Sequence, residues 1–453
     1  MTDGWLPDLT QSTGTKYQAI ADALDAAIVR GDLRRGDRLP PQREVAAKLG
    51  VDLTTVTKAY DAARLRGLIE ARGRAGSFVA ATHEPIVPPP LVDTGMNMPP
   101  EISGGLLSRA INETSAALLA GSEMAWLQYA PAGGAEQDRA AGAALLTRRG
   151  LPSGEEQVIV TAGGQNALHA ILTSTLGAGD VVACGRFIYP GFKALAERLG
   201  LTLLPLEAID AATLEAACRV HPVRALYVVP TNDNPTASTV SEAERAAIAG
   251  VVRHHALQVI EDDAYGLLAS DPIPPIAAFA PEHCWYVASL SKIVTPALRV
   301  AFVRTPSVGS AIRLATDVHE TAIMAPPLNA AMVSRWIGDG MFERLVSAMR
   351  GEIAWRQALA ESLLGDLAGA RSAEGYHLWL PLPGHLRADD LAAAMRPHGL
   401  SVVGAGSFAV GDNDTGAVRV SLGGLLDRER LARALRVLHG HLSQPIGKAT
   451  PLV

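Results

Sequence analysis

A single lysine, Lys292, lies in the apolar stretch ASLSKIVTPALRVAF of residues 288–302, with Ser289 and Ser291 before it and Arg299 seven residues after it. Burial of an ammonium in apolar surroundings is unfavourable, so the pKa of such a lysine falls and its amine becomes a nucleophile. An amine of this kind can form a Schiff base with an aldehyde cofactor. The two hydroxyls and the guanidinium would then bind a phosphate, to which arginine offers a bidentate contact. The stretch is equally compatible with a surface lysine that follows a strand.

A second group of residues suited to phosphate follows the apolar segment VIVTA at 158–162. Gly163, Gly164 and Gln165 open the helix that comes next. Backbone amides at a helix N-terminus, unshielded by Cβ atoms, can bind a phosphate. A plain strand-to-helix turn would contain the same two glycines.

These residues require a scaffold that brings strand ends together. Apolar segments alternate with helical stretches at 158–162, 181–185, 225–230, 257–263, 285–290 and 299–303. Continuous apolar strands separated by helices predict a largely parallel sheet covered on both faces. Ligands of such sheets bind at the carboxyl ends of the strands, where these residues lie.

The pattern S-x-S-K-x-x-x-x-x-x-R, followed by an apolar strand, resembles the lysine segment of fold-type-I aminotransferases, which bind pyridoxal 5'-phosphate (PLP). The resemblance implies that Lys292 is the catalytic lysine and carries PLP. Four further side chains would contact the ring. Tyr189 can stack on it, and Asn234 lies in NDNPTA. Asp262 and Tyr265 have the D-x-x-Y spacing of the family. Ala237 stands where the family's N-P-x-G has glycine. Asp263 is a rival of Asp262 and is expected on the other face of its strand.

Two residues farther from the lysine also match the family. Arg419 in AVRVSLGG corresponds to the arginine that binds the substrate α-carboxylate, and Tyr129 in LQYAPAGG to the tyrosine that reaches the phosphate site of the neighbouring subunit. The resemblance therefore implies a homodimer, and it covers roughly 350 residues. We expect an α/β body at 101–453 with a small α+β subdomain from about 335 to 453.

The first 80 residues have a different pattern. Helical periodicity at 16–30, 42–49 and 53–66 is followed by two short strands at 68–71 and 77–80 around a glycine-containing basic turn. This order predicts a winged helix-turn-helix domain. Residues 30–74 contain eleven Lys or Arg against six Asp or Glu, a net charge of +5, whereas the whole chain carries −6 and the remainder therefore −11. A basic segment on an acidic body suggests contact with nucleic acid.

The pattern G-x-L-x-x-G-D-x-L-P-x-x-R-E-x-A-x-x-L-G-V, then T-V-x-x-A-Y-x-x-x-x-x-x-G-L, resembles the GntR family of DNA-binding domains. The resemblance implies that the third helix enters the major groove of double-stranded DNA and the wing approaches the minor groove. The implied DNA-binding residues are Arg43, Thr54, Thr55, Lys58, Arg72, Gly73 and Arg74. Leu53 stands where the family commonly has an arginine or another polar residue.

Residues 81–100 are rich in proline and predict a semi-rigid linker. The three cysteines have no metal-ligand spacing, so we expect no metal site and a reducing compartment. The N-terminus has no signal-peptide pattern, and no apolar run reaches the length of a membrane span, so we expect a cytoplasmic protein without membrane contact.

A GntR-like domain joined to an aminotransferase-like body resembles the MocR subfamily of transcription regulators. This resemblance implies a PLP-dependent DNA-binding regulator that senses an amine or amino-acid effector through an external aldimine, without physiological turnover. Two alternatives remain open: an active aminotransferase that carries a DNA-binding domain, and a regulator that senses PLP itself.

Overall fold

The computed structural model describes residues 5–7, 15–34, 36–80, 95–120, 125–365, 367, 370–371, 374–411 and 416–443. The chain divides into two compact units, Met1–Val92 and Asp93–Val453. Residues 81–94 of the predicted linker lie outside the described residues.

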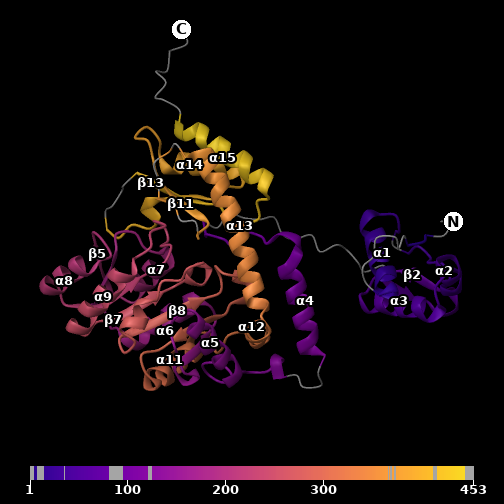
Figure 1. The fold of residues 1–453 in the computed structure, drawn as a ribbon, viewed down its shortest axis with the longest axis horizontal. Coiled ribbons are helices and arrows are strands. Elements are labelled where there is room, and N and C mark those ends of the chain that lie inside the picture. The colour runs from indigo at the N-terminus through magenta and orange to yellow at the C-terminus, as the bar shows by residue number, and fades with distance from the viewer. Residues whose placement is uncertain are drawn as a thin grey trace, which may run out of the picture. The chain divides into compact units, whose positions relative to one another are not determined.

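The N-terminal unit is a winged helix-turn-helix, as predicted. Its helices are α1 (Lys16–Arg30), α2 (Gln42–Leu49) and α3 (Leu53–Leu65), and its strands β1 (Ile69–Ala71) and β2 (Ser77–Val79) pair antiparallel (Figure 1). Gly50 ends α2 with a positive φ of 61°, which glycine adopts without strain and which allows the tight turn into α3. Ile20, Val56 and Tyr60 are fully buried in the small core that joins the three helices.

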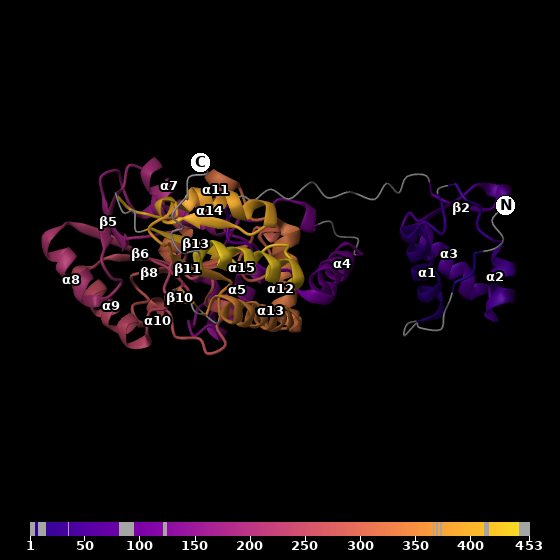
Figure 2. The same cartoon turned by 90° about the horizontal axis from the view of Figure 1, so that it is seen from above.

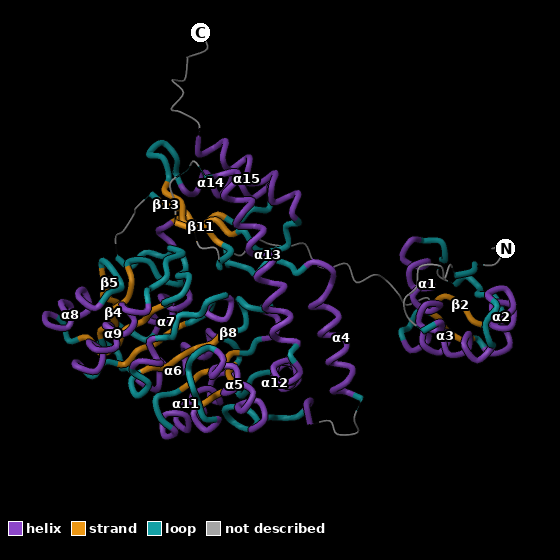
Figure 3. The backbone as a smooth tube through the Cα atoms, in the orientation of Figure 1, coloured by secondary structure: helices purple, strands orange, loops and turns teal. Residues whose placement is uncertain are grey.

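The second unit is built on a seven-stranded mixed sheet of order β3-β9-β8-β7-β6-β4-β5 (Figure 3). Strands β4 to β8 run parallel, and β9 pairs antiparallel with both β3 and β8. The strands are β3 (Val158–Thr161), β4 (Val181–Gly185), β5 (Thr202–Leu206), β6 (Val223–Val228), β7 (Gln258–Asp262), β8 (Cys284–Ser289) and β9 (Ala301–Arg304).

Alternation along these strands creates two cores, one on each face. Val259 and Tyr286 point into one core, and Ile260 and Val287 into the other. The first face is covered by α5 (Glu136–Arg148), α8 (Ala211–Val220), α9 (Glu242–His255) and α10 (Ile276–Phe279), and the second by α6 (Gly164–Thr175), α7 (Pro190–Arg198) and α11 (Val308–Ala322).

A smaller antiparallel sheet of order β10-β11-β13-β12 forms the C-terminal subdomain, which α13 (Met341–Leu364) joins to the large sheet region (Figure 1). Its strands are β10 (Ala370–Arg371), β11 (His377–Pro381), β12 (Val402–Gly404) and β13 (Ala417–Ser421), and its other helices are α14 (Ala388–Met395) and α15 (Arg428–Ser443). Seen from above, α4 (Leu106–Leu119) lies beside α12 (Pro327–Asp339) (Figure 2). The expected fold class, a PLP-transferase α/β fold with a small α+β subdomain, is confirmed.

Two features differ from expectation. The sequence indicated six strands in the large sheet, and the structure adds β5 at its edge. Pro205 lies inside β5, and proline is tolerated there because an edge strand needs fewer ladder hydrogen bonds. Residues 95–100, which were expected to be linker, instead belong to the second unit, where Asn97 is buried. Among the described residues, no helix is both long and apolar enough to cross a membrane.

Candidate cofactor and effector site

Lys292 lies in the turn directly after β8, at the carboxyl edge of the large sheet. Its Nζ donates a hydrogen bond to the carbonyl oxygen of Asn97 at 2.6 Å. Burial lowers the pKa of Lys292 to about 8, and the positive charge of Arg419 acts in the same direction. The negative charge of Asp262 opposes this shift. The amine is therefore more easily deprotonated near neutral pH than an exposed lysine.

Glycines, a serine and an arginine converge beside the lysine. A Cβ atom on Gly163, whose φ is 85°, would lie 2.7 Å from Cζ of Arg299, and one on Gly164 would lie 3.2 Å from Oγ of Ser289. Arg299 also donates to the carbonyl of Ala162 at 2.8 Å. A helix N-terminus, a hydroxyl and a guanidinium thus meet at one point, which is the donor set that binds phosphate.

Two other residues expected at the phosphate contribute less direct contacts. Gln165 donates its side-chain amide to the carbonyl of Gly191 at 2.9 Å, while its Oε1 is buried without a hydrogen-bond partner among the described residues. Ser291 is half-buried, and its backbone N–H donates to Oγ of Ser289 at 3.4 Å.

Asp262 ends β7 with its carboxyl group buried on the α6 face of the sheet. The hydroxyl of Tyr227 donates to its Oδ2 at 3.1 Å. Burial raises the pKa of Asp262 to about 6, because the charged form loses its hydration. A carboxylate buried without a cationic partner is well suited to a ligand N–H.

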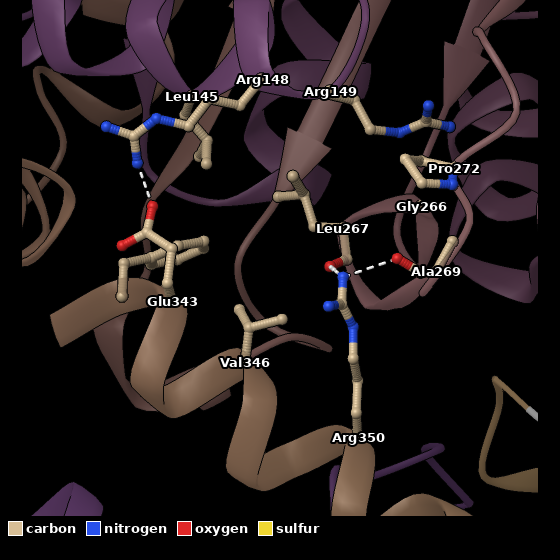
Figure 4. A pocket seen from close by; sticks show the side chains of 11 residues that line it. Leu145, Arg148, Arg149, Gly266, Leu267, Ala269, Pro272, Glu343, Val346 and Arg350 are labelled. Carbon is tan, nitrogen blue, oxygen red and sulfur yellow. Dashed lines mark hydrogen bonds and ion pairs between the residues drawn. The ribbon is translucent and has the colours of Figure 1, made fainter. Parts of the chain in front are cut away.

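Asp263 points to the opposite face, where its Oδ2 is paired and its Oδ1 has no hydrogen-bond partner among the described residues. Its Oδ2 accepts hydrogen bonds from the Tyr286 hydroxyl at 2.6 Å and from Nε of Arg149 at 2.9 Å. Arg149 also borders a pocket of about 150 Å³ between α5 and α13 (Figure 4). The other two arginines of that pocket are bound as well, Arg148 by Glu343 and Arg350 by the carbonyls of residues 267–269. This side of the strand therefore offers no unpaired charge to a ligand.

Tyr265 belongs to a buried polar network that the sequence did not reveal. Nδ2 of Asn97 donates to its hydroxyl at 2.8 Å and lies 3.1 Å from Nδ1 of His377, and Oδ1 of Asn97 accepts from Ser421 at 2.7 Å. Burial lowers the pKa of His377 to about 3, so its imidazole is neutral and Nε2–H donates to the carbonyl of Asp233. Every polar atom of the Asn97 amide has a partner, which fixes the Tyr265 phenol.

Arg419 on β13 is 2% exposed and lies over the ring of Phe408, with Cζ 5.0 Å from the ring centroid. Its Nη1 donates to Oδ1 of Asn234 at 3.0 Å and its Nη2 to the carbonyl of Gly95 at 2.5 Å. Asn234 thus contacts the arginine expected to bind the effector.

The two remaining tyrosines are placed differently. Tyr189 caps α7 and is half-buried, and burial together with the charge of Asp262 raises its pKa. It therefore lies within electrostatic reach of the ring-side carboxylate. Tyr129 is 80% exposed, so within one chain it does not line this site.

In the N-terminal unit, the expected DNA-binding side chains are mostly exposed. Thr54 and Lys58 are exposed on α3, Thr55 is half-buried, and Arg43 is exposed on α2. Arg72 is already engaged, because it pairs with Glu70 at 2.5 Å and lies over Phe78, with Cζ 4.7 Å from the ring centroid. Gly73 is exposed at the wing, and the Arg74 side chain lies outside the described residues.

The site fits PLP on its donor set. A phosphate cradle, an amine of lowered pKa, a buried phenol and a buried carboxylate occur in one region, and a side chain on Gly163 would collide with Arg299. Sequence reasoning missed Gly95, Asn97, Tyr227 and His377. The first two were masked by the proline-rich composition around them, and the last two carried no motif.

Comparisons with known proteins agree with this geometry. Residues 95–438 match the family described as aminotransferase class I and II, and residues 16–79 match the bacterial regulatory proteins of the gntR family. The chain is 30% identical over 450 residues to the HTH-type transcriptional regulator YdeF of Bacillus subtilis, covering 96% of each chain. It is 28% identical to the vitamin B6 salvage pathway transcriptional repressor PtsJ of Salmonella typhimurium, covering 92% of this chain and 96% of PtsJ.

Among solved structures, the α-aminoadipate aminotransferase LysN of Thermus thermophilus superposes with a TM-score of 0.68 at 26% identity, covering 77% of this chain and 90% of LysN. The match to one family spans most of the body, and the match to the other spans nearly the whole N-terminal unit. The chain therefore belongs to the aminotransferase class I and II family, in the MocR-type architecture that joins such a body to a GntR-family helix-turn-helix domain.

Proposed function

We propose that this chain is a PLP-dependent, DNA-binding transcriptional regulator whose body binds an amine or amino-acid effector. The observation that carries the proposal is Lys292, a half-buried lysine of lowered pKa that lies among a phosphate cradle, a buried carboxylate and a buried arginine. When bound, PLP supplies an aldehyde that captures primary amines and a ring that withdraws electrons.

Each side chain of the site has a distinct part in this proposal. Ser289, Ser291, Arg299 and the α6 N-terminus at 163–165 hold the phosphate, and Tyr189 covers the ring. Asp262 would accept a hydrogen bond from the protonated ring nitrogen, and Tyr265 would donate one to the ring oxygen. Arg419 binds the effector carboxylate through two parallel N–H groups, with Asn234 beside it.

The second unit is proposed to act as a homodimer in which Tyr129 reaches the neighbouring subunit's phosphate. Its 80% exposure in one chain is the observation that supports this role. Two DNA-binding units per dimer would read two half-sites through the exposed Lys58 and Thr54 on α3, in the cytoplasm where the DNA lies.

Lys292→Ala tests the proposal against a matched control. Lys193 is the body's other described lysine, and it too donates to a backbone carbonyl, that of Ala409 at 2.8 Å. We expect Lys292→Ala to abolish the absorption band of lysine-bound PLP and Lys193→Ala to retain it. Survival of the band in Lys292→Ala would refute the assignment.

A second candidate function is catalysis by an aminotransferase that carries a DNA-binding domain. It is favoured by the completeness of the site, in which Asn234 and every other expected PLP residue of the body is present. Multiple turnover with an amino acid and a keto acid would support this alternative. A shift of DNA affinity with PLP alone would instead support a sensor of PLP; the relative PtsJ is named a transcriptional repressor of the vitamin B6 salvage pathway.

A further inference from the structure

We propose that residues 95–98 are an internal, displaceable ligand of this site, and that an effector carboxylate competes with the Gly95 carbonyl for Arg419. This inference rests on the proposed function and names its regulation. The segment directly follows residues 81–94, which join the body to the DNA-binding unit, so its release is a direct route from effector to DNA.

The segment occupies the two cations that ligands of the site need. The Gly95 carbonyl accepts from Nη2 of Arg419 at 2.5 Å, and the Asn97 carbonyl accepts from Nζ of Lys292 at 2.6 Å. Both are charge-assisted hydrogen bonds to neutral oxygens, made by a buried guanidinium and a half-buried ammonium. A single stretch of backbone thus holds the site's amine and its carboxylate-binding group together.

A carboxylate that binds Arg419 through its two terminal nitrogens shares them with the contacts that they already make. Bidentate binding uses two parallel N–H groups of one guanidinium. Both terminal nitrogens of Arg419 already donate, one to Asn234 and one to Gly95. A charged carboxylate is the stronger acceptor, so it displaces the Gly95 carbonyl.

The cofactor acts on the second contact. Condensation of the Lys292 amine with an aldehyde forms a C=N bond, releases water and leaves at most one hydrogen on Nζ. An ammonium has three. The hydrogen bond to the Asn97 carbonyl is thereby weakened, while the Asn97 side chain keeps its own bonds to Tyr265 and Ser421.

Anchors downstream direct the movement toward Gly95. The Met98 carbonyl accepts from the Gly424 N–H at 3.0 Å, and the Asn97 side chain is fully bonded. Gly95 is half-buried and has a positive φ of 68°. The segment is therefore anchored at 97–98, and we place its hinge at Gly95, the end that directly follows residues 81–94. Because coupling is reciprocal, a DNA-bound unit that pulls on this end changes effector affinity by the same factor.

Gly95→Ala weakens the docked segment while every side chain that we propose for the site is kept. A Cβ on Gly95 would meet only Cγ2 of Val403 at 3.6 Å, an ordinary contact, whereas the left-handed backbone disfavours alanine. We expect the PLP-loaded full-length variant to bind glycine about fivefold more tightly than wild type, with unchanged binding of methylamine, which lacks the carboxylate. Gly104→Ala is the matched control, since Gly104 has a φ of 75° and nothing within 4 Å of the added Cβ.

Affinities are read from the cofactor absorption, and a second readout uses wild-type protein alone. Hydrogen exchange of the segment 95–98 is expected to rise with glycine and not with methylamine. Equal glycine affinity in Gly95→Ala, Gly104→Ala and wild type, or unchanged exchange with bound glycine, would overturn the inference. Absence of the PLP band, or equal wild-type affinity for glycine and methylamine, would instead contradict the proposed function.

Discussion

The neighbouring carboxylates Asp262 and Asp263 lie on opposite faces of one strand end, and their amide variants should separate cofactor binding from stability. In the part of the chain that the structure describes, Tyr227 is the one hydrogen-bond donor to the Asp262 side chain. Asp263 instead pairs with Arg149, and the side chains of Asp263 and Arg149 are 0% and 1% exposed. Asp263→Asn leaves a buried guanidinium without its counter-charge. Asp262→Asn leaves the Tyr227 hydroxyl with an amide oxygen as acceptor.

The magnitudes follow from these partners. Breaking a buried ion pair by removing one charge costs about 3–5 kcal/mol. Burial raises the pKa of Asp262 from 3.8 to about 6, so the charged form lowers the stability of the folded protein by up to about 3 kcal/mol at neutral pH. The free energy of unfolding of Asp262→Asn should therefore lie between that of wild type and a value about 3 kcal/mol higher. The loss of one charge-assisted bond to the ring nitrogen should weaken PLP binding by about 10- to 100-fold.

The stability difference between Asp262→Asn and wild type should depend on pH. Because the folded protein retains the Asp262 proton up to about pH 6 and the unfolded chain loses it near 3.8, this group lowers stability as pH rises through that window. The stabilisation of Asp262→Asn over wild type should therefore be full above pH 6 and vanish near pH 4.

Denaturant unfolding followed by tryptophan fluorescence is a suitable assay, since five of the six tryptophans lie in the body. Protein concentration is held constant because the proposed dimerisation would add to stability. PLP affinity is measured on the folded variants by absorption. Equal destabilisation by both variants, or normal PLP affinity in Asp262→Asn, would refute the division of roles.

Further predictions concern DNA, pH and the dimer. Lys58→Ala should weaken binding to duplex DNA and should lower the number of counterions released on binding by about one. Lys48→Ala should change DNA affinity less, because Lys48 pairs with Glu44 at 2.9 Å. Equal losses of affinity in the two variants would contradict a DNA contact by the exposed Lys58. The rate of PLP capture should reach half its maximum near pH 8, the pKa of Lys292. Arg419→Gln should move this midpoint to higher pH, because it removes a nearby positive charge. A midpoint near pH 10.5 in wild type would contradict the lowered pKa of this amine. Tyr129→Phe should lower PLP affinity only at concentrations at which sedimentation shows a dimer, and a loss in the monomer would place Tyr129 in its own subunit's site.

The large sheet and the winged helix-turn-helix could be predicted because their patterns are local. Helical periodicity placed α1 at Lys16–Arg30 and α2 at Gln42–Leu49 with their observed bounds, and buried parallel strands read as continuous apolar runs. β5 escaped because Pro205 weakens the strand pattern, and proline is tolerated only where a strand lies at the edge of the sheet.

The site residues with family motifs could be named from sequence, but their partners could not. Asn97 contacts residues 168, 280 and 324 positions away, and nothing in its neighbourhood signals that distance. His377 opens β11 beneath Asp233 and carries no motif. Proline-rich composition predicts an extended segment, and it cannot show that residues 95–98 are extended across a binding site.

The end of β7 shows why alternation along a strand decides which carboxylate can serve a ligand. Glu261, Asp262 and Asp263 are consecutive and buried, yet Glu261 accepts the N–H groups of Ile276 and Ala277 at 2.8 Å, and Asp263 accepts Arg149. Both odd positions face the core that contains α5 and α10, where backbone N–H groups of α10 bind Glu261 and an arginine pairs with Asp263. The even position faces the α6 side, where Tyr227 is its one hydrogen-bond donor within the described ranges. A one-residue shift of register would exchange these environments. The strand pairing that stabilises the sheet therefore also places Asp262 as the carboxylate that we propose for PLP.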